Sequence, residues 1–181
     1  LVMGIVNVTP DSFSDGGRFL DHRAAIAHAR ALIAEGAAIV DIGGESTRPG
    51  ARQPELDEEL ARVLPVVAAA VTMGVPVSVD TSRPEVMAAA LDAGADIVND
   101  VRALQRPGAI DVLAAHANAG VCLTHMQGEP QTMQAAPRYA DVVSEVKANN
   151  RRAEETLGAA EAWSVAAQAW TKRKPDRPRM D

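Results

Sequence analysis

Short apolar runs alternate along the chain with longer segments whose apolar residues recur at helical spacing. The runs predict five β-strands, at residues 2–6, 38–42, 75–79, 96–98 and 121–124. The segments between them predict helices near 22–35, 55–73, 84–93 and 108–119. In the first of these, Ala25, Ala29, Leu32 and Ile33 would share one helix face. Strands separated by helices are typical of βαβ units in a parallel sheet, so we expect an α/β fold.

Residues suited to helix ends support several of these boundaries. Asp21 can cap the first helix. Pro54 and the acidic cluster at 55–59 suit the positive start of the second, and Pro84 suits an early turn of the third. The predicted helices therefore begin where their capping residues stand.

A weak internal repeat helps to choose among the possible α/β folds. Residues 35–41 (EGAAIVD) resemble residues 93–99 (AGADIVN), and each reads as a helix end, a glycine C-cap, a short buried strand and a polar residue. A repeated β/α unit predicts a TIM (β/α)8 barrel, whose active site lies at the C-terminal ends of the strands. A doubly wound open sheet is the alternative, but no glycine-rich G-x-G-x-x-G fingerprint follows the first strand.

The count of strands falls short of a closed barrel. About five β/α units end by Thr124, and no convincing strand pattern follows Glu145. We expect residues 1–146 to form a partial barrel domain and residues 147–181 to be helical at first, then a disordered basic tail from Lys172 onward. The chain also opens at Leu1 in an apolar run, so we expect that its true N-terminus is missing.

Composition excludes several classes of partner. The net charge of −6 argues against a general affinity for nucleic acid or anionic membranes, and no apolar run has transmembrane length. Aromatic residues make up only 3% of the chain, so Ala, Val, Leu and Ile must fill the core. The single cysteine, Cys122, rules out an internal disulfide and suits a reducing compartment. We therefore expect a cytoplasmic protein.

Polar residues recur at the ends of the predicted strands. They are Asn7, Asp41, Asp80, Asn99 and His125. Any one of them could simply serve a turn or a helix cap. Five in one barrel would converge on a single pocket, which favours a functional site.

Two long loops follow the first two strands, at residues 9–17 and 43–50. Both are rich in Gly, Ser and Pro, and both exceed the usual length of a βα loop. They could be ordinary surface loops. Phe13, one of only two phenylalanines, favours lids over a site instead.

Five motifs then resemble one enzyme family. They are MGIVNVTPDSFSDGG (3–17), DIGGESTRPGA (41–51), SVDTSRPEV (78–86), IVNDVRAL (97–104) and THMQGEPQTMQ (124–134). In order and spacing they are similar to the motifs of the dihydropteroate synthases, over residues 1 to about 146. Pterin-binding methyltransferase domains share the barrel, but they are not expected to carry both long loops.

The resemblance implies a transferase of tetrahydrofolate biosynthesis and a target of sulfonamides. Such enzymes condense (7,8-dihydropterin-6-yl)methyl diphosphate with 4-aminobenzoate, giving 7,8-dihydropteroate and diphosphate, and the full-length family is expected to be homodimeric. The implied substrate-binding residues are Thr47, Asp80, Asn99 and Met126. A buried carboxylate and a buried amide suit the donor and acceptor edge of a pterin. Mg²⁺ is the implied cofactor, with Asn7 as a ligand.

Other residues receive less definite roles. The loop candidates for catalysis are Asp11, Phe13, Asp15 and Arg48. Asp41 is a weaker pterin-binding candidate, His125 is expected to be a hydrogen-bonded structural residue, and Cys122 a buried strand residue.

Three further family motifs are not found in this sequence. They are an Asp-Pro-Gly-x-Gly-Phe-x-Lys run, a Ser-Arg-Lys segment and an Arg-x-His pair, which supply pterin-binding and diphosphate-binding side chains. We therefore expect a fragment, truncated or frame-shifted after about residue 157, with little activity of its own. A non-catalytic remnant that binds pterin weakly is the third interpretation.

Overall fold

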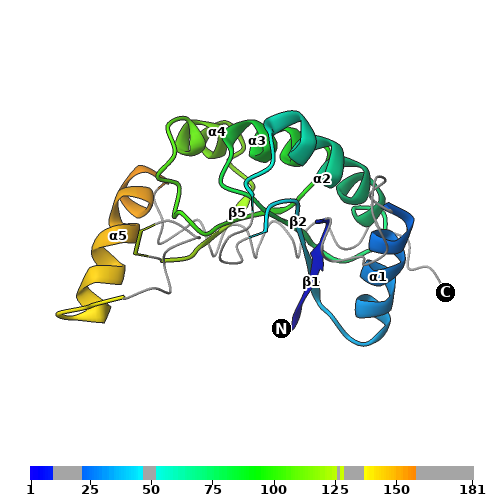
Figure 1. Ribbon diagram of the computed structural model, residues 1–181, viewed down its shortest axis with the longest axis horizontal. Coiled ribbons are helices and arrows are strands. Elements are labelled where there is room, and N and C mark those ends of the chain that lie inside the picture. The colour runs from blue at the N-terminus through cyan, green and yellow to red at the C-terminus, as the bar shows by residue number, and fades with distance from the viewer. Residues whose placement is uncertain (10–21, 47–51, 126, 129–136, 158–181) are drawn as a thin grey trace.

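A computed structural model describes residues 1–9, 22–46, 52–125, 127–128 and 137–157. Its elements are β1 (Met3–Asn7), α1 (His22–Ala34), β2 (Ile39–Gly43), α2 (Leu56–Ala70), β3 (Val77–Asp80), α3 (Pro84–Asp92), β4 (Ile97–Asp100), α4 (Ala109–Ala115), β5 (Gly120–Leu123) and α5 (Val142–Leu157). Helices α1 to α4 form an arch over the strands, which line its concave side (Figure 1).

The five strands form one parallel sheet in the order β1-β2-β3-β4-β5. A doubly wound sheet would reverse its strand order and carry helices on both faces. Sequential order with the helices on one side is instead the geometry of a barrel wall. The sequence prediction of a partial TIM barrel with about five β/α units is confirmed.

The repeated segment has the same local structure in both copies. Gly36 and Gly94 adopt φ values of 105° and 103°, in the left-handed region that favours glycine. Each follows a helix and turns the chain into the next strand, with backbone hydrogen bonds from Ala37 N to Leu32 O and from Ala95 N to Ala90 O, both 2.9 Å. This closing pattern is a Schellman-type helix end, which the glycines in the sequence predicted.

The hydrophobic core lies between the sheet and the arch of helices. Val6, Ile42, Val79 and Val98 point toward the helices and are completely buried. They pack with a cluster of helix residues that includes Ala25, Ala29, Val63, Val66, Val67, Val86, Met87 and Ala90. Small and β-branched side chains thus fill the core, as the scarcity of aromatic residues required. The concave face of the sheet, on the side away from helices α1 to α4, does not contribute to this core (Figure 1).

Helix α5 begins earlier than the sequence indicated. It spans Val142–Leu157 without a break at position 146, where the predicted domain boundary lies. The boundary stays a prediction, and the segment from Lys172 onward lies outside the described residues.

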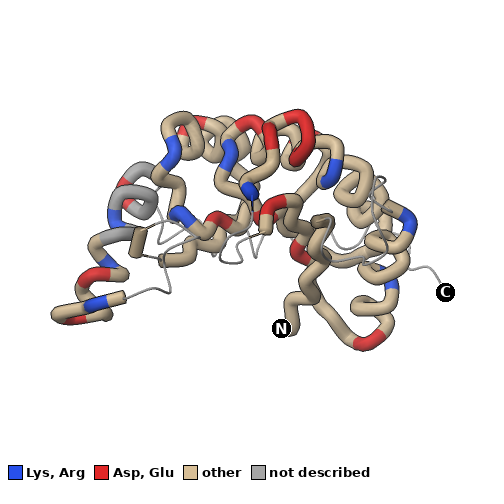
Figure 2. The backbone as a smooth tube through the Cα atoms, viewed as in Figure 1, with Lys and Arg blue, Asp and Glu red and all other residues tan. Residues whose placement is uncertain are grey.

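No helix among those the structure describes is both long and apolar enough to cross a membrane. Lys and Arg residues are interspersed with Asp and Glu along the arch (Figure 2).

His116 joins the end of α4 to the end of α3. Its Nδ1 lies 2.7 Å from Val112 O and its Nε2 lies 3.1 Å from an Asp92 carboxylate oxygen. The Val112 carbonyl, and then Asp92, raise the pKa of His116 above its usual value. Because the folded state holds this proton more tightly, the interaction stabilises the protein below about pH 6.5. The stabilisation is lost as pH rises through the folded pKa.

We expect His116→Gln to lower the free energy of unfolding by roughly 0.3–1 kcal/mol at about pH 6, and by less at about pH 8. The expected loss is small because the Asp92 side chain is largely exposed. Denaturant titrations of the two proteins at both pH values measure the difference. Asp92→Asn, which keeps the Val112 contact, should give part of the effect. An equal loss at both pH values would contradict the assignment.

Candidate functional site

One row of residues crosses the concave face of the sheet. The strand register places Asn7 opposite Gly43, Gly43 opposite Asp80, Asp80 opposite Asn99, and Asn99 opposite Cys122. Because successive side chains alternate between the faces of a sheet, this row points away from the helix-covered core. Four of the five positions carry polar groups or a thiol. Asn7, Asp80 and Asn99 therefore lie in one row at the strand ends, and their convergence on a binding pocket stays a prediction.

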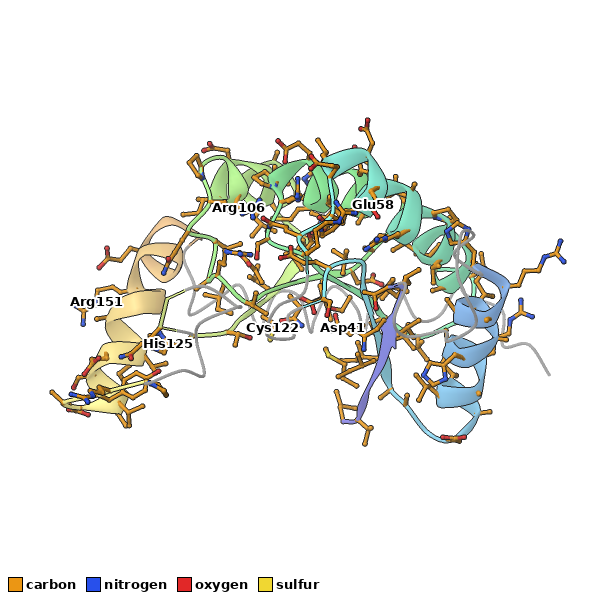
Figure 3. All side chains as sticks on the ribbon, viewed as in Figure 1. Asp41, Glu58, Arg106, Cys122, His125 and Arg151 are labelled. Atoms are coloured by element: carbon orange, nitrogen blue, oxygen red, sulfur yellow. The ribbon has the colours of Figure 1, made fainter. Side chains whose placement is uncertain are left out.

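Asp41 stands one row below, on the same face. Its Oδ2 accepts a hydrogen bond of 3.0 Å from Nδ2 of Asn99, which reaches across the intervening strand β3. The β3 residue between them is Ser78, whose small side chain leaves room for the two to meet. Asp41 is only 3% exposed, so this hydrogen bond is shielded from solvent. Figure 3 shows Asp41 and Cys122 at the sheet, and Glu58 on α2.

Three buried polar atoms of this face lack a hydrogen-bond partner among the described residues. They are Asp41 Oδ1, Asn99 Oδ1 and Ser78 Oγ. A buried acceptor without a donor costs about 1–3 kcal/mol. Two unpaired acceptors beside one hydrogen bond form an arrangement that a ligand rich in N–H donors would complete.

Asp80 is the most electrostatically perturbed group of the site. Burial raises the pKa of its carboxyl to about 7, and the nearby carboxylates of Asp41, Glu45, Asp100 and Glu59 add to the shift. The neighbouring Gly43 keeps the space beside this carboxyl open, since a Cβ there would lie 3.4 Å from the Asp80 Cβ. A carboxyl group whose pKa lies near neutral pH, with free space beside it, is typical of a functional site.

Asn7 lies at the exposed end of β1, in the same row. Its amide oxygen is a hard ligand of the kind that Mg²⁺ accepts. No group of three or more His, Cys, Asp and Glu side chains within the described ranges could hold a metal by itself. Asn7 as a ligand of Mg²⁺ stays a prediction, and most of the other ligands would have to be oxygens of the substrate and water.

Two strand-end residues differ from their sequence-based interpretation. Cys122 was expected to be buried, but it is only partly buried because it faces the concave side; burial, Asp41 and Asp80 raise the pKa of its thiol. His125 was expected to be hydrogen-bonded. Neither of its ring nitrogens has a partner in the part of the chain that the structure describes, and its ring lies 5.6 Å from that of Tyr139.

Several predicted site residues cannot be placed. Asp11, Phe13, Asp15, Thr47, Arg48 and Met126 lie outside the described residues. Their roles stay predictions.

The sequence did not single out two buried carboxylates close to the site. Glu59 was assigned to the acidic start of α2, and Asp100 follows the more conspicuous Asn99. Both are completely buried. Glu59 carried a weak signal, since it recurs at helical spacing with the apolar Val63 and Val66 on the core face of α2.

The chain matches a family model described as "Pterin binding enzyme" over residues 3–168, which extends beyond the 146 residues of the motif resemblance. It is 51% identical over 168 residues to the dihydropteroate synthase of Escherichia coli K12, covering 92% of this chain and 58% of that protein. The chain thus spans less than two thirds of the length of this relative.

Two solved structures have the same fold. The first is a Xanthomonas albilineans dihydropteroate synthase with 4-aminobenzoic acid (TM-score 0.77, 51% identity, 88% of this chain and 56% of that one). The second is a Burkholderia cenocepacia dihydropteroate synthase complexed with 7,8-dihydropteroate (TM-score 0.74, 46% identity, 92% and 56%). The five β/α units described here correspond to a little over half of each.

Proposed function

The chain belongs to the pterin-binding enzyme family, and on that premise we propose that the protein containing it is a dihydropteroate synthase. It would condense (7,8-dihydropterin-6-yl)methyl diphosphate with 4-aminobenzoate to give 7,8-dihydropteroate and diphosphate. The observation that carries the proposal is the concave row, where Asp80 and Asn99 stand in register at the strand ends and Asn99 is hydrogen-bonded to Asp41 one row below.

The pterin would bind through its 2-amino-4-oxo-pyrimidine edge. The adjacent 2-amino and ring N–H groups can donate two hydrogen bonds to the Asp80 carboxylate, and such charge-assisted pairs are strong. The free oxygens of Asp41 and Asn99 supply further acceptors. A flat, donor-rich ring is thus the class of ligand that would satisfy the unpaired atoms of this face.

The reaction needs no protein nucleophile. The C–O bond to diphosphate breaks and leaves a cationic pterin methylene, and the amine of 4-aminobenzoate then forms the C–N bond and loses a proton. The positive charge delocalises from the methylene into the pterin ring, and the carboxylates of Asp80 and Asp41 at the pyrimidine edge would stabilise it without reorganisation. Mg²⁺, held by Asn7 together with substrate phosphates and water, would supply charge neutralisation for the leaving diphosphate.

The related structures support small-molecule substrates, since one holds 4-aminobenzoic acid and another 7,8-dihydropteroate. A cytoplasmic location and a homodimer are parts of the same proposal, based on the family resemblance.

The test compares two asparagines by isothermal titration of the protein with pterin. Asn99→Ala removes the acceptor and leaves Asp41 without its hydrogen bond, so we expect the Kd for pterin to rise about 10- to 30-fold. The control is Asn118→Ala, at an exposed position beyond α4, which should leave the Kd within about twofold. The full-length protein that contains this chain should also form dihydropteroate from both substrates with Mg²⁺, whereas we expect residues 1–181 alone to form little. Equal Kd values in the two variants would refute the placement of the pterin.

A further inference from the structure

We propose that two buried carboxylates, Glu59 and Asp100, position Asp80. They bind opposite sides of the loop that directly follows Asp80 in the chain. The loop consists of residues 81–83 and connects β3 to α3. The inference rests on the pterin-binding role proposed above for Asp80, and it assigns a function to two residues that do not face the concave row.

The loop is polar and yet almost inaccessible to water. Thr81 and Ser82 are each 2% exposed. Buried hydroxyl groups require partners, because an unmade hydrogen bond in the interior is costly. Each of these hydroxyls finds a carboxylate, and each carboxylate comes from a different element.

Glu59 holds the loop from the side of α2. Its Oε1 accepts a hydrogen bond of 2.5 Å from Oγ1 of Thr81, and its Oε2 lies 2.9 Å from Nε of Arg83. The guanidinium of Arg83 also donates to the carbonyl of Pro54, just before α2. Glu59 is completely buried, so both interactions are made away from water, where charge-assisted contacts are strongest.

Asp100 holds the loop from the side of β4. Its Oδ1 accepts hydrogen bonds of 2.5 Å from Oγ of Ser82 and 2.8 Å from the backbone N–H of Arg102. Its Oδ2 accepts one of 2.7 Å from the N–H of Leu104. Ala103 and Leu104 have φ values of 49° and 58°, a left-handed turn that non-glycine residues adopt only when held.

Neither carboxylate can touch a ligand on the concave face. Glu59 belongs to α2, on the other side of the sheet, and Asp100 shares the helix-facing side of β4 with the buried Val98. They act instead on the residue between them, since Thr81 directly follows Asp80 and its N–H is also bonded to Asn99 O at 3.1 Å.

The loop must resist a force that acts on Asp80. Neighbouring carboxylates repel its negative form, which is part of why its pKa is raised. An unsupported strand end would relieve that repulsion by moving the carboxyl toward water. Supporting residues that orient a binding group commonly contribute about 10- to 100-fold to affinity at metal sites, and the same logic applies here.

The test separates positioning from simple stabilisation. Four variants are compared, Glu59→Gln, Thr81→Val, Ser82→Ala and Asp100→Asn, with Glu85→Gln at an exposed position of α3 as control. Pterin Kd is measured at about pH 8, where Asp80 is mostly ionised, together with the thermal midpoint of each variant. The two loop variants keep both carboxylates, so they report even if a carboxylate variant does not fold.

We expect the four variants to raise the Kd of folded protein about tenfold, and Glu85→Gln to leave it within about twofold. The double variant Thr81→Val/Glu59→Gln should bind no more weakly than the weaker single variant, because both changes weaken the same attachment of the loop to α2. Lowered thermal midpoints with unchanged Kd in the folded variants would overturn the proposal and leave a structural role. If Asp80→Asn also bound pterin normally, the proposed function itself would fall, and with it this inference.

Discussion

Asp80→Asn is expected to weaken pterin binding by on the order of 10² or more, the largest effect on binding among the variants considered. The carboxylate offers two acceptors to the two adjacent donors of the pterin edge. An asparagine has the same shape but turns an N–H₂ group toward one of those donors. Two donors then face each other, and the pterin N–H loses its acceptor in a partly buried position. Titration calorimetry with pterin measures the loss directly.

The same carboxyl predicts a pH dependence of affinity. The pterin donors require the ionised form of Asp80, whose pKa in the free protein is about 7. At about pH 6 only about a tenth of the molecules carry the charge, so the apparent Kd should be about tenfold weaker than its plateau above pH 8. Asn99→Ala should keep this dependence, whereas Asp80→Asn should abolish it. A flat profile for the unmodified protein would contradict the assignment.

Stability should respond to pH in the opposite direction. A carboxyl whose folded pKa is raised binds its proton more tightly in the folded state than in the unfolded one. The free energy of unfolding should therefore fall as pH rises from about 4 to about 7, as the folded protein bears the charge in an unfavourable place. A ligand that donates to Asp80 should reduce this loss.

Gly44→Ala is expected to lower the free energy of unfolding by about 3 kcal/mol, the largest stability effect among the variants considered. A Cβ at this position would lie 2.7 Å from Cγ2 of Val63 and 3.2 Å from Cγ of Glu59. Both of these side chains are completely buried and cannot yield. The loop would also lose the hydrogen bond of 2.8 Å that Nη1 of Arg62 donates to Gly44 O if the backbone moved away from α2.

The adjacent glycine gives a matched control for this prediction. In Gly43→Ala the added Cβ would meet Asp80 only at ordinary contact distance, so stability should change by less than about 1 kcal/mol. Its methyl group would instead take space beside the Asp80 carboxyl, and pterin affinity should fall. Thermal or denaturant unfolding of both variants measures the difference. An equal loss in the free energy of unfolding would show that crowding against α2 is not the cause.

The alternation of apolar runs and helical segments was enough to predict the fold. Strands β1 to β5 appear within two residues of the predicted starts, because strands that pack against helices are rich in β-branched apolar residues such as Val77 and Val79. The glycine ends at Gly36 and Gly94 were also predictable, since only a left-handed residue closes a helix in this way. Asn7, Asp80 and Asn99 could be assigned to one edge from their place at the strand ends.

Side-chain partners in the interior could not be predicted in the same way. The Asp41–Asn99 bond joins residues that are 58 positions apart and depends on the register of three strands. Glu59 reads in the sequence as one more acidic residue near a helix start, where solvated carboxylates are common. Its burial follows from the approach of the β3–α3 loop, which only the three-dimensional packing of α2 and α3 determines.

The sequential order of the strands also bears on how the chain acquires its structure. Each strand pairs with the one that precedes it along the polypeptide, separated only by the helix that covers both. Closing such short loops costs little entropy compared with pairing distant segments. During synthesis, each new strand therefore finds its neighbour already made. The wall can grow one β/α unit at a time from β1, and the row that holds Asp80 and Asn99 is assembled as those units dock.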